Sequence, residues 1–92
     1  MIATVEIDEN LKKSLHRVPL AIKNKLFVWV AAVEERGLAE VRKIPGFHDE
    51  PLKGDRYGQR SIRLNKKWRA IYKIIHAKIE FALIEEVTPH DY

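Results

Sequence analysis

The sequence predicts an α+β fold, with an N-terminal strand and two main helices packed on one face of a mainly antiparallel sheet of about four strands. Two observations predict this fold. Apolar residues between positions 9 and 44 recur at helical spacing, and from residue 59 the period falls to two, as in strands. The connections between these late strands are only a few residues long, which permits antiparallel neighbours and no crossover. We therefore expect a single domain over residues 1–92.

The N-terminal part combines short elements with one long helix. The segment Ile2–Ile7 is short and β-branched, which favours a strand, and Asp8 is a suitable cap for a helix over residues 9–18. Pro19 suits the first position of a second helix, and Gly37 provides a left-handed stop. The apolar stripe of this helix should form the main contact with the sheet and consists of Ile22, Leu26, Trp29, Val30 and Val33.

The C-terminal part predicts a three-stranded meander. Residues 38–44 have the pattern of one more short amphipathic turn, and we expect a loop over residues 47–51. The predicted strands are Gln59–Leu64, Trp68–Ile75 and Ile79–Val87.

Positive charge is concentrated in residues 53–73, which hold eight of the seventeen Lys and Arg residues against a single acid, Asp55. The eight cations are Lys53, Arg56, Arg60, Arg63, Lys66, Lys67, Arg69 and Lys73. A pI near 9.5 with the charge in one stretch points to a polyanionic partner, and nucleic acid is the commonest. A solvated basic face is the alternative.

The composition excludes several classes of site. The chain has no cysteine, so it can build neither a disulfide nor a thiolate metal site, and this fits a reducing compartment. His16, His48 and His76 lack metal-ligand spacing, so we expect no metal and no cofactor. The first residues do not form a signal peptide, and no apolar run could span a membrane. We expect a cytoplasmic protein with no membrane partner.

Two groups of residues could carry chemistry. Arg63 and Arg69 lie on neighbouring predicted strands, and they share a sheet face if the register allows it. Two guanidinium groups on one face would bind a phosphate, although ordinary polar alternation explains the pattern equally well. The chain ends in His90, Asp91 and Tyr92, all of which can exchange protons, and a polar chain end is the plain alternative.

The segment L-K-G-D-R-Y-G-Q-R-S-I-R-L-N-K-K-W-R-A-I-Y, together with the closing E-V-T-P-H-D-Y, resembles the RelE/HigB family of toxins from bacterial type II toxin–antitoxin pairs. The likeness spans essentially the whole chain. It implies a RelE-like microbial RNase fold and a metal-independent mRNA interferase that cleaves messenger RNA in the ribosomal A site. It also implies neutralisation by a cognate antitoxin, for which we expect a helix-turn-helix protein similar to HigA, with operator DNA contacted only through that antitoxin.

The resemblance assigns roles to single residues. Lys53 matches the lysine of the L-K-G segment, Arg69 matches an arginine that contacts the scissile phosphate, and Arg63 matches a basic sheet residue. Asp91 and Tyr92 match acidic and aromatic tail residues, and His90 completes the set expected to share proton transfer. The remaining cations are expected to hold RNA and are Arg56, Arg60, Lys66, Lys67 and Lys73.

One position departs from the family pattern. Glu50 stands where HigB-like members have a histidine, so His48 or His90 could replace that group. The alternative to a catalytic function is a non-catalytic basic module that binds ribosomal RNA or DNA. Charge alone does not distinguish binding from cleavage.

Overall fold

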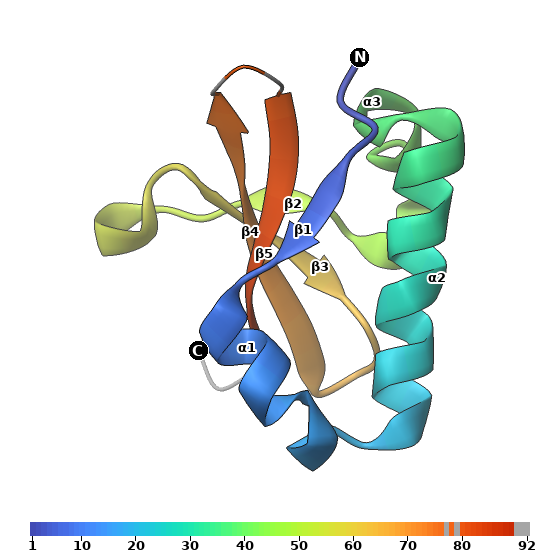
Figure 1. The fold of residues 1–92 in the computed structure, drawn as a ribbon, viewed down its shortest axis with the longest axis vertical. Helices are drawn as coiled ribbons and strands as arrows, with labels where there is room; N and C mark the ends of the chain where they lie inside the picture. Colours follow the sequence, from blue (N-terminus) through green and yellow to red (C-terminus); the bar gives the residue numbers. More distant parts are fainter. Residues whose placement is uncertain (77, 79, 90–92) are drawn as a thin grey trace.

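The structure is a computed structural model that describes residues 1–76, 78 and 80–89. Its main elements follow one another as an α+β chain of five strands and three α-helices among the described residues (Figure 1). In chain order they are β1 (Val5–Ile7), α1 (Glu9–Ser14), α2 (Leu20–Arg36), α3 (Leu38–Val41), β2 (Glu50–Pro51), β3 (Gln59–Arg63), β4 (Trp68–His76) and β5 (Glu80–Pro89). Short 3-10 turns cover residues 15–17, 45–47 and 54–56.

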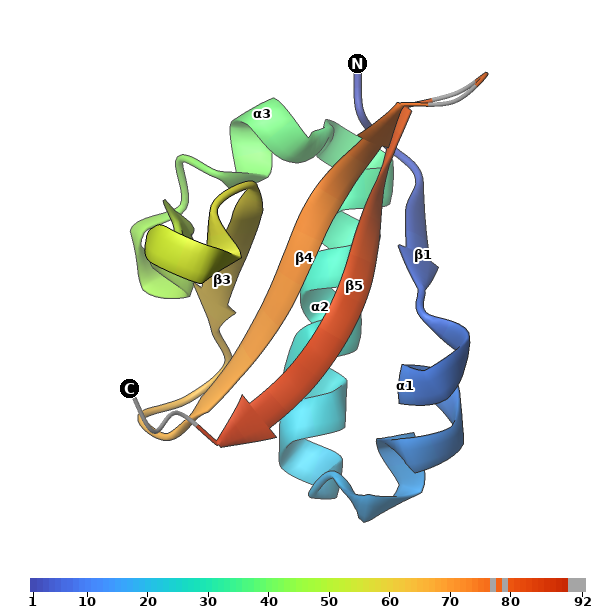
Figure 2. The same ribbon diagram turned by 90° about the vertical axis from the view of Figure 1, so that its left-hand side faces the viewer.

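One sheet unites all five strands in the order β1-β5-β4-β3-β2. The strands β2, β3, β4 and β5 pair antiparallel, as the short connections predict, whereas β1 pairs parallel to β5. Figures 1 and 2 show α2 running along one face of this sheet, with α1 beside β5. The predicted fold class is confirmed, and the sheet has one strand more than the sequence indicated.

The fifth strand is β2, in a segment expected to be a loop. It pairs only Glu50 with Ser61 and Pro51 with Arg60. A two-residue strand that contains a proline carries no period-two pattern, so only its partner β3 defines it. The strand β1 likewise begins at Val5 and not at Ile2.

The ends of α1 and α2 follow from local chemistry. The Asp8 side chain accepts hydrogen bonds from the backbone N–H groups of Asn10 and Leu11, at 3.0 and 3.4 Å, which caps α1 as predicted. Pro19 is the cap residue of α2, one position earlier than expected. Gly37 ends α2 with φ 87° and ψ 148°, and an added Cβ would lie 2.8 Å from Met1 side-chain atoms, so glycine is required there.

The hydrophobic core lies between α2 and the sheet. Ile22, Leu26, Trp29 and Val33 of the predicted stripe are buried. The rings of Trp29 and Tyr72 pack with centroids 5.0 Å apart, which joins α2 to β4.

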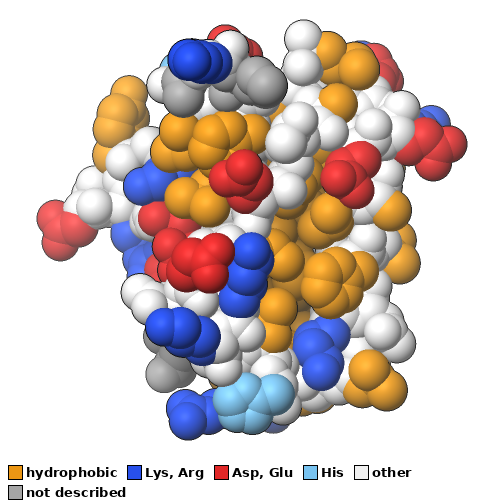
Figure 3. All heavy atoms as spheres, viewed as in Figure 1, with side chains coloured by type: hydrophobic (Ala, Val, Ile, Leu, Met, Phe, Trp, Pro, Cys, Tyr) orange, Lys and Arg blue, Asp and Glu red, His pale blue; other side chains and the backbone are white. Residues whose placement is uncertain are grey.

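The outer side of α2 is also partly apolar, because Leu20, Phe27 and Val28 are exposed. Figure 3 shows hydrophobic side chains at the surface on the α2 side of the molecule. Among the described helices, none is long and apolar enough to cross a membrane.

Candidate active site

The two arginines singled out by the sequence face each other across neighbouring strands. The register pairs Arg63 on β3 directly with Arg69 on β4, and Arg69 in turn with Thr88 on β5. Nη1 of Arg63 lies 3.5 Å from Nε2 of His48. We call these four residues, His48, Arg63, Arg69 and Thr88, the cation row.

The cation row lies on the sheet face that points away from α2. Side chains alternate along a strand, and the neighbours Ile62 and Ala70 belong to the core cluster that contains the α2 stripe. Arg63 and Arg69 therefore project from the opposite face. The α2 face therefore carries the core, and the opposite face carries the two arginines.

Arg69 is buried although it is a cation, with 7% of its surface exposed. Its Nε and Nη1 atoms, and Nε of Arg63, are buried without a hydrogen-bond partner among the described residues. No carboxylate in the described part of the chain forms an ion pair with either arginine. Like charges directly opposite in a sheet are destabilising, and a buried unpaired guanidinium is costly. An anion bound between the two guanidinium groups would relieve both costs.

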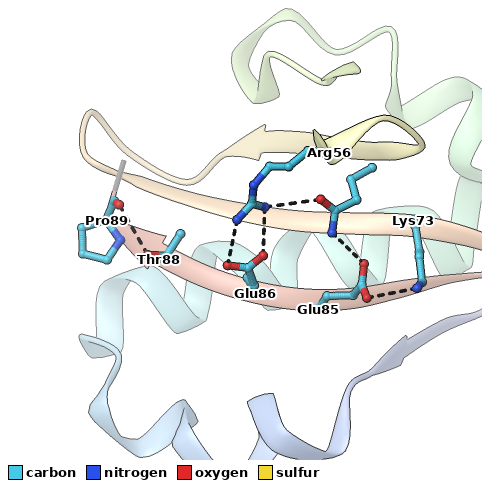
Figure 4. A network of polar contacts seen from close by, with 7 residues as sticks. Arg56, Lys73, Glu85, Glu86, Thr88 and Pro89 are labelled. Carbon is cyan, nitrogen blue, oxygen red and sulfur yellow. Dashed lines mark hydrogen bonds and ion pairs between the residues drawn. The ribbon is translucent and has the colours of Figure 1, made fainter. Parts of the chain in front are cut away.

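An acidic network occupies the next positions on the same face (Figure 4). A register shift pairs Ile71 with Glu86 and Tyr72 with Ile84, so Glu85 is an extra residue in β5. Such a bulge changes the direction in which side chains point. Here the carboxylates of Glu85 and Glu86 both face side chains of β4 and of the 52–58 loop.

Both carboxylates of this network bind cations. Arg56 donates to Glu86 at 2.9 and 3.4 Å, and Lys73 lies 3.2 Å from Glu85, which also accepts from Gln59 at 3.1 Å. Figure 4 shows Thr88 and Pro89 following these residues along β5. Arg56 and Lys73, both predicted to bind RNA, are thus ion-paired within the chain.

Arg60 lies on the other side of the sheet from the cation row. Its Nε donates to Asp49 at 2.6 Å, and the Asp49 side chain is fully buried. The hydroxyl of Tyr72 donates to the second Asp49 oxygen at 2.5 Å. Burial, followed by this bond to Asp49, raises the pKa of Tyr72. The alternation of side chains along β3 predicts that Arg60 lies on the α2 face. The bond to Asp49 gives Arg60 a partner within the chain.

The three remaining lysines are at the surface. Lys66 and Lys67 are exposed in the turn between β3 and β4, where Oδ1 of Asn65 accepts from the backbone N–H groups of Lys67 and Trp68. Lys53 is exposed at the start of the 52–58 loop. These lysines have no ion pair among the described residues and can contact a polyanion directly.

The predicted tail residues His90, Asp91 and Tyr92 lie outside the described residues. The strand β5 is described to Pro89, one residue past Thr88 of the cation row.

Sequence reasoning missed two parts of this face. It treated His48 as a surface or packing residue and only as a possible replacement for the family histidine, and it gave no role to Glu85 and Glu86. The backbone of His48 has φ 46°, a left-handed conformation uncommon outside glycine. The consecutive Glu85-Glu86, which interrupts the alternation of β5, was the only signal of the bulge.

Comparison with solved structures gives the decisive likeness. A YoeB/ParE toxin from Agrobacterium tumefaciens matches 96% of this chain and 99% of its own, with a TM-score of 0.67 at 16% identity. The archaeal RelE–RelB complex from Pyrococcus horikoshii matches 97% of this chain and 96% of its own, with a TM-score of 0.69 at 23% identity. YafQ from E. coli gives 0.67 at 19% identity and covers 92% of this chain and 90% of its own.

This chain has the fold of the RelE/ParE toxins. No protein-family model matches its sequence, and no curated protein sequence matches it. At 16–23% identity, the likeness of this chain to the three proteins is one of fold. It covers 92–97% of this chain.

Proposed function

We propose that this protein is the toxin of a type II toxin–antitoxin pair and a ribosome-dependent mRNA interferase. The observation that carries the proposal is the direct pairing of Arg63 with Arg69, both with buried nitrogen atoms that lack partners among the described residues. A phosphodiester fits between two guanidinium groups because each can offer paired donors to the non-bridging oxygens. The RelE/ParE fold supports the same assignment.

The proposed reaction uses the nucleophile that RNA itself carries. The 2′-hydroxyl attacks the adjacent phosphorus, its proton passes to a base, and a phosphorane develops negative charge. The bond to the 5′-oxygen then breaks, that oxygen takes a proton from an acid, and a 2′,3′-cyclic phosphate remains. Arg63, Arg69 and Lys53 stabilise the phosphorane charge. No step of this scheme needs a metal ion or a cofactor.

Proton transfer is assigned to His90, Asp91 and Tyr92, with His48 as an additional group. His48 lies 3.5 Å from Arg63, so its imidazole is close to the place where the phosphate would bind. Glu50 at the HigB-like histidine position has no imidazole, and His48 supplies one two residues earlier in the chain.

Cleavage of translated mRNA tests the proposal directly. Purified protein is added to ribosomes programmed with mRNA, and primer extension locates the cuts. We expect A-site cleavage by the wild type and its loss in Arg69→Ala, with antitoxin binding unchanged as the control for folding. Cleavage by a well-folded Arg69→Ala protein at the wild-type rate would refute the catalytic assignment.

Removal of Asp91 and Tyr92 tests the tail in the same assay. We expect this truncation to abolish cleavage and growth inhibition. A truncated protein that cuts ribosome-bound mRNA as well as the wild type would leave the tail without a catalytic role.

The assay also separates catalysis from simple binding. A non-catalytic module would show modest losses of affinity in single mutants and a reduced salt dependence, whereas an enzyme shows large losses of cleavage with nearly constant binding.

The proposed partners are the ribosome, its mRNA and a cognate antitoxin, all in the cytoplasm. Several of the solved structures that this chain resembles are complexes, among them RelE with RelB from Pyrococcus horikoshii and YoeB with YefM from Staphylococcus aureus. For this chain we expect a helix-turn-helix antitoxin that alone contacts operator DNA. Co-expression with the adjacent small reading frame should rescue growth and yield a stable complex.

A further inference from the structure

A pocket separate from the cation row lies at the β2–β3 edge of the sheet. It has a volume of about 300 Å³, and the apolar side chains of Leu52 and Ile74 form part of its lining. Arg42, at the end of α3, and Arg60 contribute guanidinium groups, and Tyr57 contributes an aromatic ring. We call this the edge pocket. Arg42 lies beside the hydroxyl of the core residue Tyr72, whereas neither the core nor the proposed phosphate site uses Tyr57.

The edge pocket has more positive than negative charge. Arg60 and Tyr72 already occupy the two oxygens of Asp49, the buried carboxylate nearest to this cluster. Arg42 forms no ion pair with a described residue, and its Nε is buried without a hydrogen-bond partner there. Arg60 is therefore neutralised by Asp49, whereas the charge of Arg42 has no partner of opposite sign among the described residues. The unneutralised charge favours an anionic ligand group at the accessible side of the pocket.

Tyr57 adds a planar apolar surface to this cationic pocket. Its side chain is 90% exposed, which is unusual for an aromatic residue without a partner surface. The loop that carries it is anchored, because Arg56 binds Glu86 on β5 and the Leu52 N–H donates to the Gln59 carbonyl at 2.9 Å. An anchored loop presents the ring with little ordering cost on binding.

We propose that the edge pocket binds one nucleotide of single-stranded RNA, with its phosphate on Arg42 and Arg60 and its base stacked on Tyr57. Single-stranded RNA is recognised by cations that hold the backbone and aromatic rings that stack on bases. The inference rests on the proposed function for the identity of the RNA.

The edge pocket would hold a nucleotide that flanks the cleaved one. Arg60 and Arg63 are three residues apart on β3, about 10 Å along the strand, and project from opposite faces. An RNA strand that passes around the short edge strand β2 could reach both sites. Exposed Lys53, which follows β2, lies near the same edge.

Titration of the full-length protein without ribosomes tests the pocket alone. Backbone amide NMR shifts are followed as 5′-GMP, inorganic phosphate or guanosine is added. For 5′-GMP we expect the largest shifts at Leu52, Tyr57 and Ile74.

Variants of the two proposed contact residues separate the phosphate site from the base site. Arg42→Gln should weaken the binding of both GMP and phosphate, and Arg42→Lys should retain part of the binding. Tyr57→Leu should weaken GMP binding about tenfold but leave phosphate binding unchanged. Tyr57→Trp should bind GMP as well as the wild type does.

Two control variants make the result specific. Phe27→Leu removes another exposed aromatic ring, on α2, and should not change the titration. Arg63→Gln alters the cation row and should leave the edge-pocket shifts in place. Melting temperatures of all variants exclude loss of folding as the cause.

Three outcomes would overturn the inference. GMP shifts could centre on His48 and Arg63, which would mean that the cation row alone binds the nucleotide. Tyr57→Leu could bind GMP with wild-type affinity. Arg42→Gln and Tyr57→Leu could weaken antitoxin binding while GMP binding stays constant, which would make the pocket a protein interface. Cleavage by the wild type is measured separately, so failure of the proposed function is distinguishable from failure of the pocket.

Discussion

At the scale of single residues, the arginines of the cation row are unfavourable for stability. Arg69 is nearly as buried as a core residue, yet it faces Arg63 and has no neutralising partner among the described residues. A protein selected for stability alone would place an apolar residue there, because a buried charge is often replaced without loss by a hydrophobic side chain of similar size. The cost of burying Arg69 without a partner therefore supports the phosphate site proposed above.

The first prediction separates stability from activity at this position. Arg69→Met should keep or raise the melting temperature, because it removes an unpaired buried charge. Cleavage of programmed mRNA should fall by about 100-fold or more, the usual loss when one charge-stabilising donor is removed. Calorimetry and primer extension on the same preparation check both parts. Lys13→Met, at an exposed position of α1, is the matched control. A large fall in melting temperature for Arg69→Met would contradict the prediction.

The second prediction concerns the pH dependence of stability through Tyr72. Burial and the bond to Asp49 raise the pKa of Tyr72 above its ordinary value near 10. Because the pKa of Tyr72 is raised in the folded state, Tyr72 makes its full contribution to the free energy of unfolding below about pH 10. That contribution is lost as the pH rises toward the folded-state pKa. Urea unfolding curves of the wild type should therefore show a steeper alkaline fall in the free energy of unfolding than those of Tyr72→Phe.

Tyr72→Phe should also cost about 1–3 kcal/mol at neutral pH, because it leaves the buried Asp49 carboxylate with one hydrogen bond fewer. Tyr57→Phe is the control, since the Tyr57 side chain is 90% exposed. Equal alkaline slopes for the wild type and Tyr72→Phe would show that Tyr72 does not contribute.

At the scale of elements, the basic stretch 53–73 divides into parts with different roles. The loop before β3 and the strand β4 carry Arg56 and Lys73, whose charges are balanced by the Glu85–Glu86 bulge of β5. The β3–β4 turn carries Lys66 and Lys67, which are exposed. Local position within an element therefore decides which of these cations are paired with a carboxylate and which are exposed.

The third prediction follows from this division. Lys66→Gln and Lys67→Gln should each lower the slope of log affinity against log salt for RNA binding by about one, as expected for a lost phosphate contact. Lys73→Gln should change the slope less, because Lys73 is paired with Glu85 at 3.2 Å. Fluorescence anisotropy with a labelled single-stranded RNA over a range of salt concentrations measures the slopes. Equal changes for all three lysines would mean that the Lys73–Glu85 pair opens on binding.

At the scale of the whole molecule, the two faces of the sheet differ in composition. The α2 face holds the core, in which Leu26 and Trp29 are fully buried, and the other face holds the cation row. A chain of 92 residues has a small core, so each large buried side chain is a considerable share of a total stability of about 5–15 kcal/mol.

The fourth prediction compares two positions of the same helix. Leu26→Ala should lower the free energy of unfolding by about 2–5 kcal/mol, because it leaves a cavity in the core. Val28→Ala, at a position that is 57% exposed, should change it by less than about 0.5 kcal/mol. Urea denaturation measures both. A similar cost for the two variants would mean that the exposed side of α2 is covered in solution.

The sequence by itself determined the elements that depend on local chemistry. Periodicity, the Asp8 cap and Gly37 fixed the main helices, and the short connections fixed the antiparallel meander. The alternation of β3 also placed Arg60 on the face opposite Arg63. These features depend on residues close together in the chain, so the sequence contains their cause.

Tertiary structure alone decided the features that depend on residues far apart in the chain. Strand pairing set the register that brings Arg63 opposite Arg69, recruited β2 to the sheet edge and created the bulge at Glu85. It also brought His48 to Arg63 and buried Arg69. A register shift of two residues would keep each side chain on its own face but give it another cross-strand partner. Alternation therefore assigns Arg63 and Arg69 to one face without pairing them.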